Sequence, residues 1–324
     1  GRPGCQHPQR RAIAGSGLAR LVTSSSGAGW QVRDHLLNPA DHTLVMGVVN
    51  VTPDSFSDGG VFASPGGTDH EAAIAHGLAL WDDGADIVDV GGESTRPGAA
   101  AVSTREEISR VVPVVAGLAA ANVVVSVDTS KPDVAAAALV AGAHVVNDVT
   151  AFRHPDMARV CADGGAGVVL MHMQGSPGTM QDNPTYGDVV GEVGAYLAQR
   201  AQVAVAAGIA PDRLCLDPGI GFGKTFDHNL ELLARLDEFV DLGFPVLVGT
   251  SRKRFLGTVL GDAGLETAPA ERDPATAATV ALAVSAGVAA VRVHDVKSAV
   301  QSARIADAIV QASLTSRREH FGRS

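Results

Sequence analysis

The sequence predicts an α/β protein built as a single (β/α)8 barrel. From Leu44 onward, short Val-rich apolar runs alternate with amphipathic stretches of helical length, a pattern typical of parallel strands that are buried on both faces. Eight such units account for the chain to about residue 310. Alternation alone is compatible with an open, doubly wound sheet or with a closed barrel, and the count of eight favours the barrel.

The runs expected to form strands are followed by polar residues. The runs are 44–49, 87–90, 123–127, 144–146, 167–171, 214–216, 245–248 and 289–293. The polar residues at their carboxyl ends are Asn50, Asp89, Asp128, Asn147, His172, Asp217, Lys253, Arg292 and His294. In a barrel these ends share one face, where the loops after the strands form the active site. The pattern therefore favours the barrel further and predicts one polar mouth.

A simpler interpretation is that polar residues after strands only cap the next helix. Ser130 can serve as the cap after Asp128, which leaves that carboxylate free. Arg292 and Lys253 cannot be N-caps, because they have no side-chain acceptor. Arg292 and His294 are two residues apart and on a strand point to the same side. Capping therefore explains only some of these residues.

Composition narrows the classes of partner. Aromatic residues make up only 4% of the chain and the net charge is −10, so we expect neither nucleic acid nor an anionic membrane as a partner. No apolar run approaches the ~20 residues that a membrane span needs. Arg96, Arg252, Lys253, Arg292 and His294 would nevertheless collect at the mouth. Their local field outweighs distant charge within about 8–10 Å and predicts a small anionic substrate.

The beginning of the chain differs from the rest. It is rich in Gly, Ser and Arg and contains no acid before Asp34, so we predict a flexible, non-catalytic extension over residues 1–40. The barrel is expected over residues 41–315 and a short tail over 316–324, with no composition shift that marks a second domain. Three widely spaced cysteines argue against a disulfide framework and predict a reducing, cytoplasmic location.

The glycine-rich segment that begins at Asp217 resembles a phosphate-binding P-loop. It reads Asp-Pro-Gly-Ile-Gly-Phe-Gly-Lys-Thr, but Pro218 occupies the position where the first glycine of a P-loop is required. Proline also removes a backbone N–H near the expected phosphates. A nucleoside-triphosphatase is therefore disfavoured.

Eight ordered motifs resemble those of dihydropteroate synthases. They are the segments 50–59 (NVTPDSFSDG), 89–98 (DVGGESTRPG), 126–131 (SVDTSK), 147–148 (ND), 170–174 (LMHMQ), 216–224 (LDPGIGFGK), 251–253 (SRK) and 292–296 (RVHDV). The match runs from about Leu44 to the last expected helix, and no motif residue is missing. Only the N-terminal extension lies outside it.

The resemblance implies a TIM barrel, usually a homodimer, and a transferase of folate biosynthesis that sulfonamides inhibit. Such an enzyme condenses 6-hydroxymethyl-7,8-dihydropterin diphosphate with p-aminobenzoate, giving 7,8-dihydropteroate and pyrophosphate with the assistance of Mg2+. The small-molecule substrates and Mg2+ are thus the expected ligands.

The resemblance also assigns roles to individual residues. The pterin pocket carries over to Asp128, Asn147, Asp217 and Lys253, with Met171 packing against the ring. The diphosphate contacts carry over to Thr95, Arg292 and His294, and the metal to Asn50. The p-aminobenzoate site carries over to Ser251, Arg96, Pro97, Phe222 and Lys253.

These residue types suit that chemistry. A buried carboxylate such as Asp128 or Asp217 can accept two adjacent N–H groups of a pterin edge, and Asn147 offers both a donor and an acceptor. Arg292 and His294 can stabilise a departing diphosphate. The motifs contain no recognisable serine or cysteine nucleophile with a partner base, so catalysis is expected to rest on positioning and electrostatics. An SN1-like path is favoured, although the sequence does not distinguish it from SN2.

Two alternatives remain at this stage. One is another pterin-binding barrel enzyme, such as a methyltetrahydrofolate–corrinoid methyltransferase, which has no diphosphate to bind and would not need Arg292 and His294. The other is a catalytically silent paralogue, which loss of motif residues would indicate.

Overall fold

The computed structural model describes residues 29–52, 69–94 and 101–321. Its main sheet is parallel and has eight strands in the order β8-β7-β6-β5-β4-β3-β10-β9. A bridge between Leu216 and Val246 joins the two outer strands, so the sheet closes into the predicted barrel. The strands are β3 (Leu44–Asn50), β4 (Ile87–Gly91), β5 (Val125–Asp128), β6 (Val145–Asp148), β7 (Gly167–Met171), β8 (Leu214–Asp217), β9 (Leu247–Val248) and β10 (Ala290–Val293).

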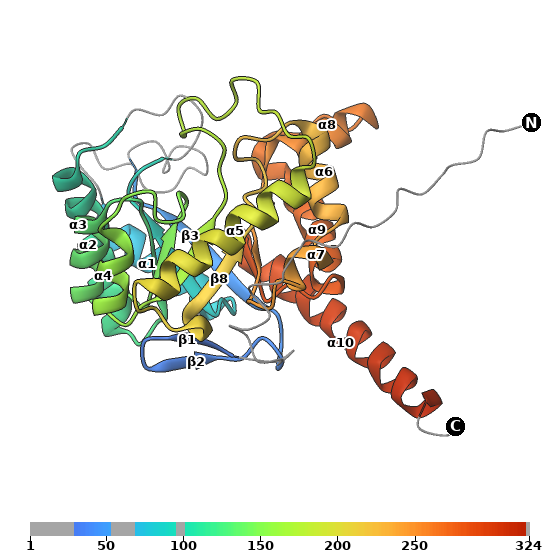
Figure 1. The fold of residues 1–324 in the computed structure, drawn as a ribbon, viewed down its shortest axis with the longest axis horizontal. Coiled ribbons are helices and arrows are strands. Elements are labelled where there is room, and N and C mark those ends of the chain that lie inside the picture. Colours follow the sequence, from blue (N-terminus) through green and yellow to red (C-terminus); the bar gives the residue numbers. More distant parts are fainter. Residues whose placement is uncertain (1–28, 53–68, 95–100, 322–324) are drawn as a thin grey trace, which may run out of the picture.

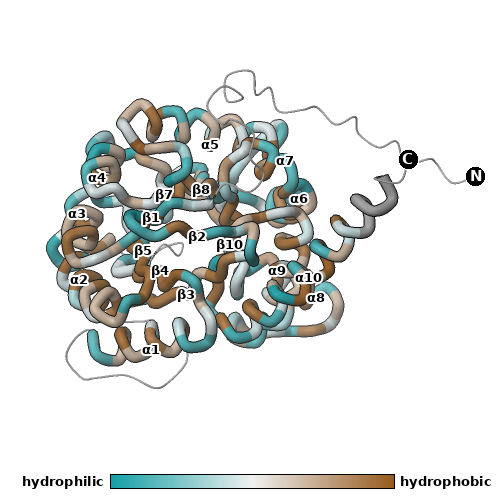
Figure 2. The backbone as a smooth tube through the Cα atoms, turned by 90° about the horizontal axis from the view of Figure 1, so that it is seen from below, coloured by the Kyte–Doolittle hydropathy of each residue, from teal (hydrophilic) through white to brown (hydrophobic). Residues whose placement is uncertain are grey.

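Helices surround the strands, as the view along the barrel in Figure 2 shows. In the described part of the chain they are α1 (His70–Asp82), α2 (Thr104–Ala120), α3 (Pro132–Val140), α4 (Met157–Asp163), α5 (Val189–Ala206), α6 (Phe226–Ala234), α7 (Asp237–Val240), α8 (Arg254–Asp262), α9 (Asp273–Ser285) and α10 (Val296–Phe321). Figure 1 shows that α10 extends beyond the barrel toward the C-terminus. None of the helices in these ranges has the length and apolar character needed to cross a membrane.

Strand residues alternate between two apolar cores. Val88 and Val90 of β4 face the helices and belong to the larger core, whereas Ile87 belongs to a second core inside the barrel. This period of two is the ordinary geometry of a strand. It puts Asp89, which lies between Val88 and Val90, on the inner side with Ile87.

An antiparallel hairpin of β1 (Trp30–Val32) and β2 (His35–Leu37) covers the end of the barrel opposite the strand carboxyl termini. Trp30 is fully buried in the inner core, and its indole N–H donates to the Arg213 carbonyl oxygen at 3.0 Å. Val32 packs against Gly167 so closely that a Cβ there would lie 2.5 Å from a Val32 methyl group. The ordered structure therefore begins earlier than residue 41, because a buried tryptophan anchors the hairpin. Residues 1–28 lie outside the described ranges.

The starts of α3 and α8 and the end of α10 depart from expectation. Ser130 is not the cap of α3: Lys131 occupies the N-cap position without a side-chain bond, and Pro132 supplies the fixed φ of the first turn. At the other end, α10 continues to Phe321 instead of giving way to a tail at residue 316.

Candidate active site

The strand-end residues expected to form the site meet at one rim of the barrel. Asp128 pairs in register with Gly91 on one side and with Asn147 on the other. Further along the sheet, Met171 pairs with Asp217. Residues far apart in the sequence thus occupy neighbouring positions at the carboxyl ends of β4 to β8.

Arg292, on β10, lies at the centre of a polar network across this rim. Its Nε donates to Asp89 Oδ2 at 2.7 Å, and its terminal nitrogen donates to Asp128 Oδ2 at 3.0 Å. The Asn147 amide also donates to Asp89 Oδ2, at 3.1 Å. Asp89 is completely buried, and these charge-assisted bonds to Oδ2 offset part of the cost of removing its charge from water; Oδ1 accepts no hydrogen bond from the described residues. The network fixes the guanidinium relative to three strands.

Burial shifts the acid–base properties of the rim. Desolvation raises the pKa of Asp128 to about 7, although Arg292 acts in the opposite direction. The pKa of Asp217 is also raised by burial, against the lowering effect of Lys253. For Arg292, burial alone would lower the pKa, but Asp89 and Asp128 together raise it. The guanidinium therefore stays charged while Asp128 can exchange its proton near neutral pH.

Lys253 connects the rim to the glycine-rich segment after β8. The expectation that Lys253 cannot be an N-cap is wrong: it occupies the N-cap position of α8, without a side-chain cap bond, because its backbone is extended there. Its Nζ donates to the Ile220 carbonyl oxygen. The same nitrogen lies 4.6 Å from the centroid of the Phe222 ring, within the range of a cation–π contact. Burial lowers the pKa of Lys253 to about 8, with Asp217 opposing and Arg292 reinforcing the shift.

Ser251 and His294 form a direct pair beside Arg292. The Ser251 hydroxyl oxygen accepts the His294 backbone N–H at 3.1 Å and lies 2.9 Å from the His294 Nδ1. A Cβ on Gly249 would lie 3.6 Å from the Arg292 Cβ and 3.9 Å from Lys253 Nζ. Lys253 and Arg292 are therefore neighbours, as predicted. Arg252, also expected in this cluster, instead donates to both carboxylate oxygens of Asp273 at the start of α9.

Oxygen donors at the end of β3 suit a hard cation. A Cβ built on Gly91 would lie 3.7 Å from Asn50 Oδ1 and 3.9 Å from Asp128 Oδ2, so both oxygens flank this glycine. Amide and carboxylate oxygens are the ligands that Mg2+ prefers, and the ion usually completes its shell with water or phosphate oxygens. The residues present fit the expected ion.

A second group of possible metal ligands lies near the hairpin, away from this rim. It consists of Asp34, His35 and His144. The Nδ1 of His144 accepts the Val125 backbone N–H at 3.1 Å. That bond requires the proton on Nε2 in the neutral ring, so His144 has no lone pair left for a metal.

Met171 forms part of an apolar wall beside the polar rim. It is buried in a small cluster with Val149, Met173 and Met180, against which Phe222 packs. A flat ring held by Asp217 would find apolar contacts here, and methionine adapts well to such rings.

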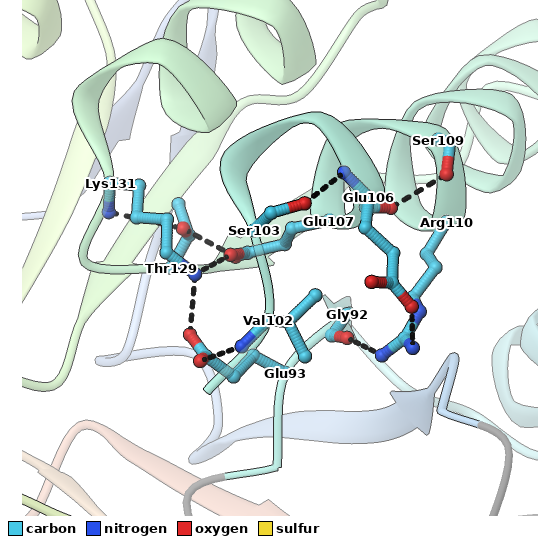
Figure 3. A network of polar contacts seen from close by, with 10 residues as sticks. All are labelled: Gly92, Glu93, Val102, Ser103, Glu106, Glu107, Ser109, Arg110, Thr129 and Lys131. Carbon is cyan, nitrogen blue, oxygen red and sulfur yellow. Dashed lines mark hydrogen bonds and ion pairs between the residues drawn. The ribbon is translucent and has the colours of Figure 1, made fainter. Parts of the chain in front are cut away.

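Thr95, Arg96 and Pro97 lie outside the described residues, but the residues on either side of them are tied to the rim (Figure 3). The Glu93 carboxylate accepts the Val102 backbone N–H at 2.8 Å and the Lys131 ammonium at 2.7 Å. Lys131 also pairs with the buried Glu107, which accepts the Thr129 hydroxyl at 2.6 Å. Both ends of the segment are thus linked to the chain next to Asp128.

Some residues of the site had no assigned role in the sequence. Asp89 was recognised as a strand-end acid, and only its contact with Arg292 reveals what it does. The sequence feature that could have indicated this role is the position of Asp89 between Val88 and Val90, inside an otherwise apolar strand. Glu107 and the contact between Lys224 and His172 had no signal, since they depend on packing between distant segments.

A protein-family profile described as "Pterin binding enzyme" matches residues 46–294. Among curated relatives, the dihydropteroate synthase of Escherichia coli K12 is 46% identical over 279 residues, which is 86% of this chain and 95% of that protein. The dihydropteroate synthase of Mycobacterium leprae is 49% identical over 271 residues, 83% of this chain and 94% of that protein.

Solved structures agree in fold. A Yersinia pestis dihydropteroate synthase in complex with a sulfonamide drug has a TM-score of 0.79 and 42% identity, covering 89% of this chain and 99% of that one. The structure of the Xanthomonas albilineans dihydropteroate synthase with 4-aminobenzoic acid has a TM-score of 0.79 and is 45% identical in sequence, covering 88% of this chain and 98% of that one. In its complex with 7,8-dihydropteroate the values are 0.75 and 43%, covering 86% and 97%.

The Arg292 network generates a stability prediction. Asp89→Asn removes one charge from a buried ion pair, and we expect the free energy of unfolding to fall by about 3–5 kcal/mol, measured by urea denaturation. The control is Asp273→Asn, which weakens the more exposed pair with Arg252 and should cost about 1 kcal/mol or less. Equal losses in the two variants would contradict the central position of Asp89.

Proposed function

The chain belongs to the pterin-binding enzyme family and is a dihydropteroate synthase, and from this premise we propose how its rim residues divide the work. The reaction joins 6-hydroxymethyl-7,8-dihydropterin diphosphate to p-aminobenzoate and yields 7,8-dihydropteroate and pyrophosphate. The observation that carries the proposal is the pairing of Arg292 with Asp89 and Asp128 at the barrel mouth. It combines a fixed cation for a diphosphate with acceptors for a pterin.

The proposed pterin pocket consists of Asp217, Asn147, Asp128, Lys253 and the wall at Met171. Asp217 Oδ1 already accepts the Gly219 backbone N–H at 2.7 Å, so the carboxylate is held in one orientation. Asp89 holds Asn147 through its amide N–H, which fixes where the amide oxygen can accept. A rigid set of donors and acceptors favours a ligand that satisfies all of them, because unmatched groups would be buried without partners.

The proposed diphosphate contacts are Arg292, His294 and Thr95. Arg292 offers a planar, permanently charged group near Ser251 and His294, and such groups match phosphate oxygens. We propose that Asn50 contributes an oxygen to Mg2+, which would supply positive charge at the diphosphate when bound.

The proposed p-aminobenzoate site lies between Phe222, Lys253 and Ser251, together with Arg96 and Pro97. The Phe222 ring provides an apolar surface, with Lys253 over it. The carboxylate would lie at the start of α8, after Lys253, where backbone N–H groups and the helix dipole favour an anion. Sulfonamides, which resemble p-aminobenzoate, are expected to compete at this site.

In the proposed mechanism the C–O bond to the diphosphate breaks first. The exocyclic methylene carries the resulting positive charge, which the dihydropterin ring delocalises and the Asp128 and Asp217 carboxylates stabilise. The aniline nitrogen then uses its lone pair to form the C–N bond and releases one proton to solvent water. Lys253 contacts the Ile220 carbonyl oxygen and the Phe222 ring and so orients this side of the site. In this mechanism catalysis depends on orientation and electrostatics, and no covalent enzyme intermediate forms.

We also propose that the enzyme is a homodimer formed through α9 and α10. Leu282, Ile305 and Ile309 are each about two-thirds exposed, at 68%, 66% and 66%. Ile305 and Ile309 line a surface groove, and Leu282 is the next residue in the chain after Ala281, which also lines it. The other lining residues are Ser285, Gln301, Ser302 and Ala306. Exposed apolar surface of this kind on paired helices is typical of an interface between copies.

The proposed location is the cytoplasm. Cys161 and Cys215 are buried free thiols, and burial raises the pKa of the Cys215 thiol well above its ordinary value, which keeps it protonated and unreactive. We further propose that the barrel from about residue 41 to 315 is the catalytic unit.

The activity itself has a direct test. Purified protein supplied with both substrates and Mg2+ should release pyrophosphate and form dihydropteroate in equal amounts, and removal of Mg2+ by a chelator should suppress both. Arg292→Ala should weaken binding of the pterin diphosphate, while a dihydropterin without diphosphate still binds. The control is Arg159→Ala, since this side chain is 68% exposed and lies on α4. Equal loss for both pterins would refute the diphosphate role of Arg292.

The pH dependence of kcat/KM for the pterin diphosphate reports groups of the free enzyme. We expect it to rise as the pH increases through about 7, where Asp128 loses its proton and becomes an acceptor. It should fall through about 8, where Lys253 loses its charge. Lys253→Arg should remove the alkaline limb, because a guanidinium stays protonated. A flat profile across neutral pH would argue against both assignments.

The dimer has a separate test. In Ile305→Glu combined with Ile309→Glu, two charges would have to be buried in the proposed interface, so sedimentation should show a monomer where the parent protein is a dimer. The matched control is Val140→Glu, which changes an equally apolar residue that is 90% exposed at the end of α3. A double variant that sediments like the parent would place the interface elsewhere.

A further inference from the structure

The segment between β8 and α6 has an unusual set of hydrogen bonds. Every backbone carbonyl oxygen from residue 219 to 223 accepts a bond, four of them from side chains of other residues. In order, the donors are the Phe222 N–H, Lys253 Nζ, Gln181 Nε2, Lys224 Nζ and the Tyr186 hydroxyl. A loop held at each peptide group presents its side chains in fixed positions, which is what a preorganised binding site requires.

Lys224 is the buried member of this set. Only 2% of it is exposed, and its Nζ lies 2.9 Å from His172 Nδ1, 3.2 Å from the His172 carbonyl oxygen and 3.0 Å from the Phe222 carbonyl oxygen. The amine can donate to the two carbonyl oxygens. Burial lowers the pKa of Lys224 well below its ordinary value, against the raising effect of Asp217. Among the described residues, no carboxylate forms an ion pair with it. The side chain that a P-loop would direct at phosphate therefore points into the protein.

The His172 ring is oriented so that its Nδ1 can accept a hydrogen bond from Lys224. Its ring packs edge-on against Tyr196, with a centroid distance of 4.9 Å. Burial and the nearby Lys224 lower the pKa of His172 to about 3, so the imidazole is neutral and its Nδ1 can accept. The pair thus joins the end of β7 to the end of the glycine-rich loop.

The loop is pressed against the same backbone carbonyl. Gly219 has φ +70°, and a Cβ there would lie 1.9 Å from the His172 oxygen. Asp217 is held by other bonds, since its backbone oxygen accepts the His172 N–H at 3.0 Å and its side chain accepts the Gly219 N–H. Lys224 therefore bonds directly to the Phe222 end of the loop. It acts on the Asp217 carboxylate only through its charge, while the Gly219 N–H holds that carboxylate in place.

We propose that Lys224, through His172 and the Phe222 carbonyl, is a positioning residue for p-aminobenzoate. It touches no substrate in this arrangement; it fixes the backbone that presents the Phe222 ring beneath Lys253. The inference rests on the proposed function, because it assumes that Phe222 contacts the aryl amine. It goes further by assigning a substrate-specific effect to a buried lysine outside the proposed pocket.

The test is a steady-state comparison of Lys224→Met with the parent enzyme, varying each substrate in turn. Methionine keeps the length and apolar stem but loses all three bonds. We expect KM for p-aminobenzoate to rise by about tenfold or more, with KM for the pterin diphosphate changed by less than about twofold. The inhibition constant of a sulfonamide should rise in parallel with KM for p-aminobenzoate. Lys224→Gln, which retains a donor, should give a smaller rise and serves if the methionine variant does not fold.

Two controls separate the possible failures. Lys297→Met makes the same substitution at an exposed lysine of α10, outside this set, and should leave both KM values within about twofold. Phe222→Ala tests the assumption itself: if KM for p-aminobenzoate is unchanged, the proposed aryl site is wrong. If Phe222→Ala raises that KM but both Lys224 variants leave it unchanged, or raise both KM values equally, the positioning role is overturned and the proposed site stands.

Discussion

The bond pattern around Arg292 is the constraint on which the rest of the site depends. A guanidinium at the mouth of a barrel must find acceptors, and β4 and β5 supply them as Asp89 and Asp128. The same Asp89 oxygen also holds Asn147 on β6. The Asp89 carboxylate thus orients both the Asn147 amide and the Arg292 guanidinium. The closed parallel sheet makes this possible, because it brings distant segments into fixed register.

The balance of charge at the rim serves opposite ends of one substrate. The chain carries a net charge of −10, yet Arg292, Lys253 and His294 come together where an anion would bind. In the proposed assignment, the buried acids face the pterin ring and the cations face the diphosphate. Because both kinds of group are partly desolvated, their interactions are stronger than they would be in water. Lowered and raised pKa values are the direct consequence of this arrangement.

Much of this arrangement could be predicted from the sequence. Each of the eight runs expected as strands contains a strand, although β5 and β9 begin two residues later than expected. Asp89 was expected at a strand end, but its inward direction was not predicted. The sequence did not reveal the hairpin, since Trp30 follows a Gly- and Ser-rich stretch and is ordered only by packing under the barrel. Ser130 was a plausible cap, but Pro132 and the ion pairs of Lys131 determine how α3 begins. The contact between Lys224 and His172 spans 52 positions, and no local pattern encodes it.

The hairpin under the barrel has a consequence for the order of events. Trp30 and Val32 fill the end of the barrel under the hairpin, together with an apolar layer that includes Leu44 and Met46. Substrates and products therefore have to pass through the opposite end, at the carboxyl termini of the strands. Asn147 and Asp217 are almost fully buried, whereas Phe222 is nearer the surface. If the pterin binds at Asn147 and Asp217 and p-aminobenzoate at Phe222, as proposed, the pterin lies deeper and has to bind first, and dihydropteroate has to leave before the next pterin diphosphate binds.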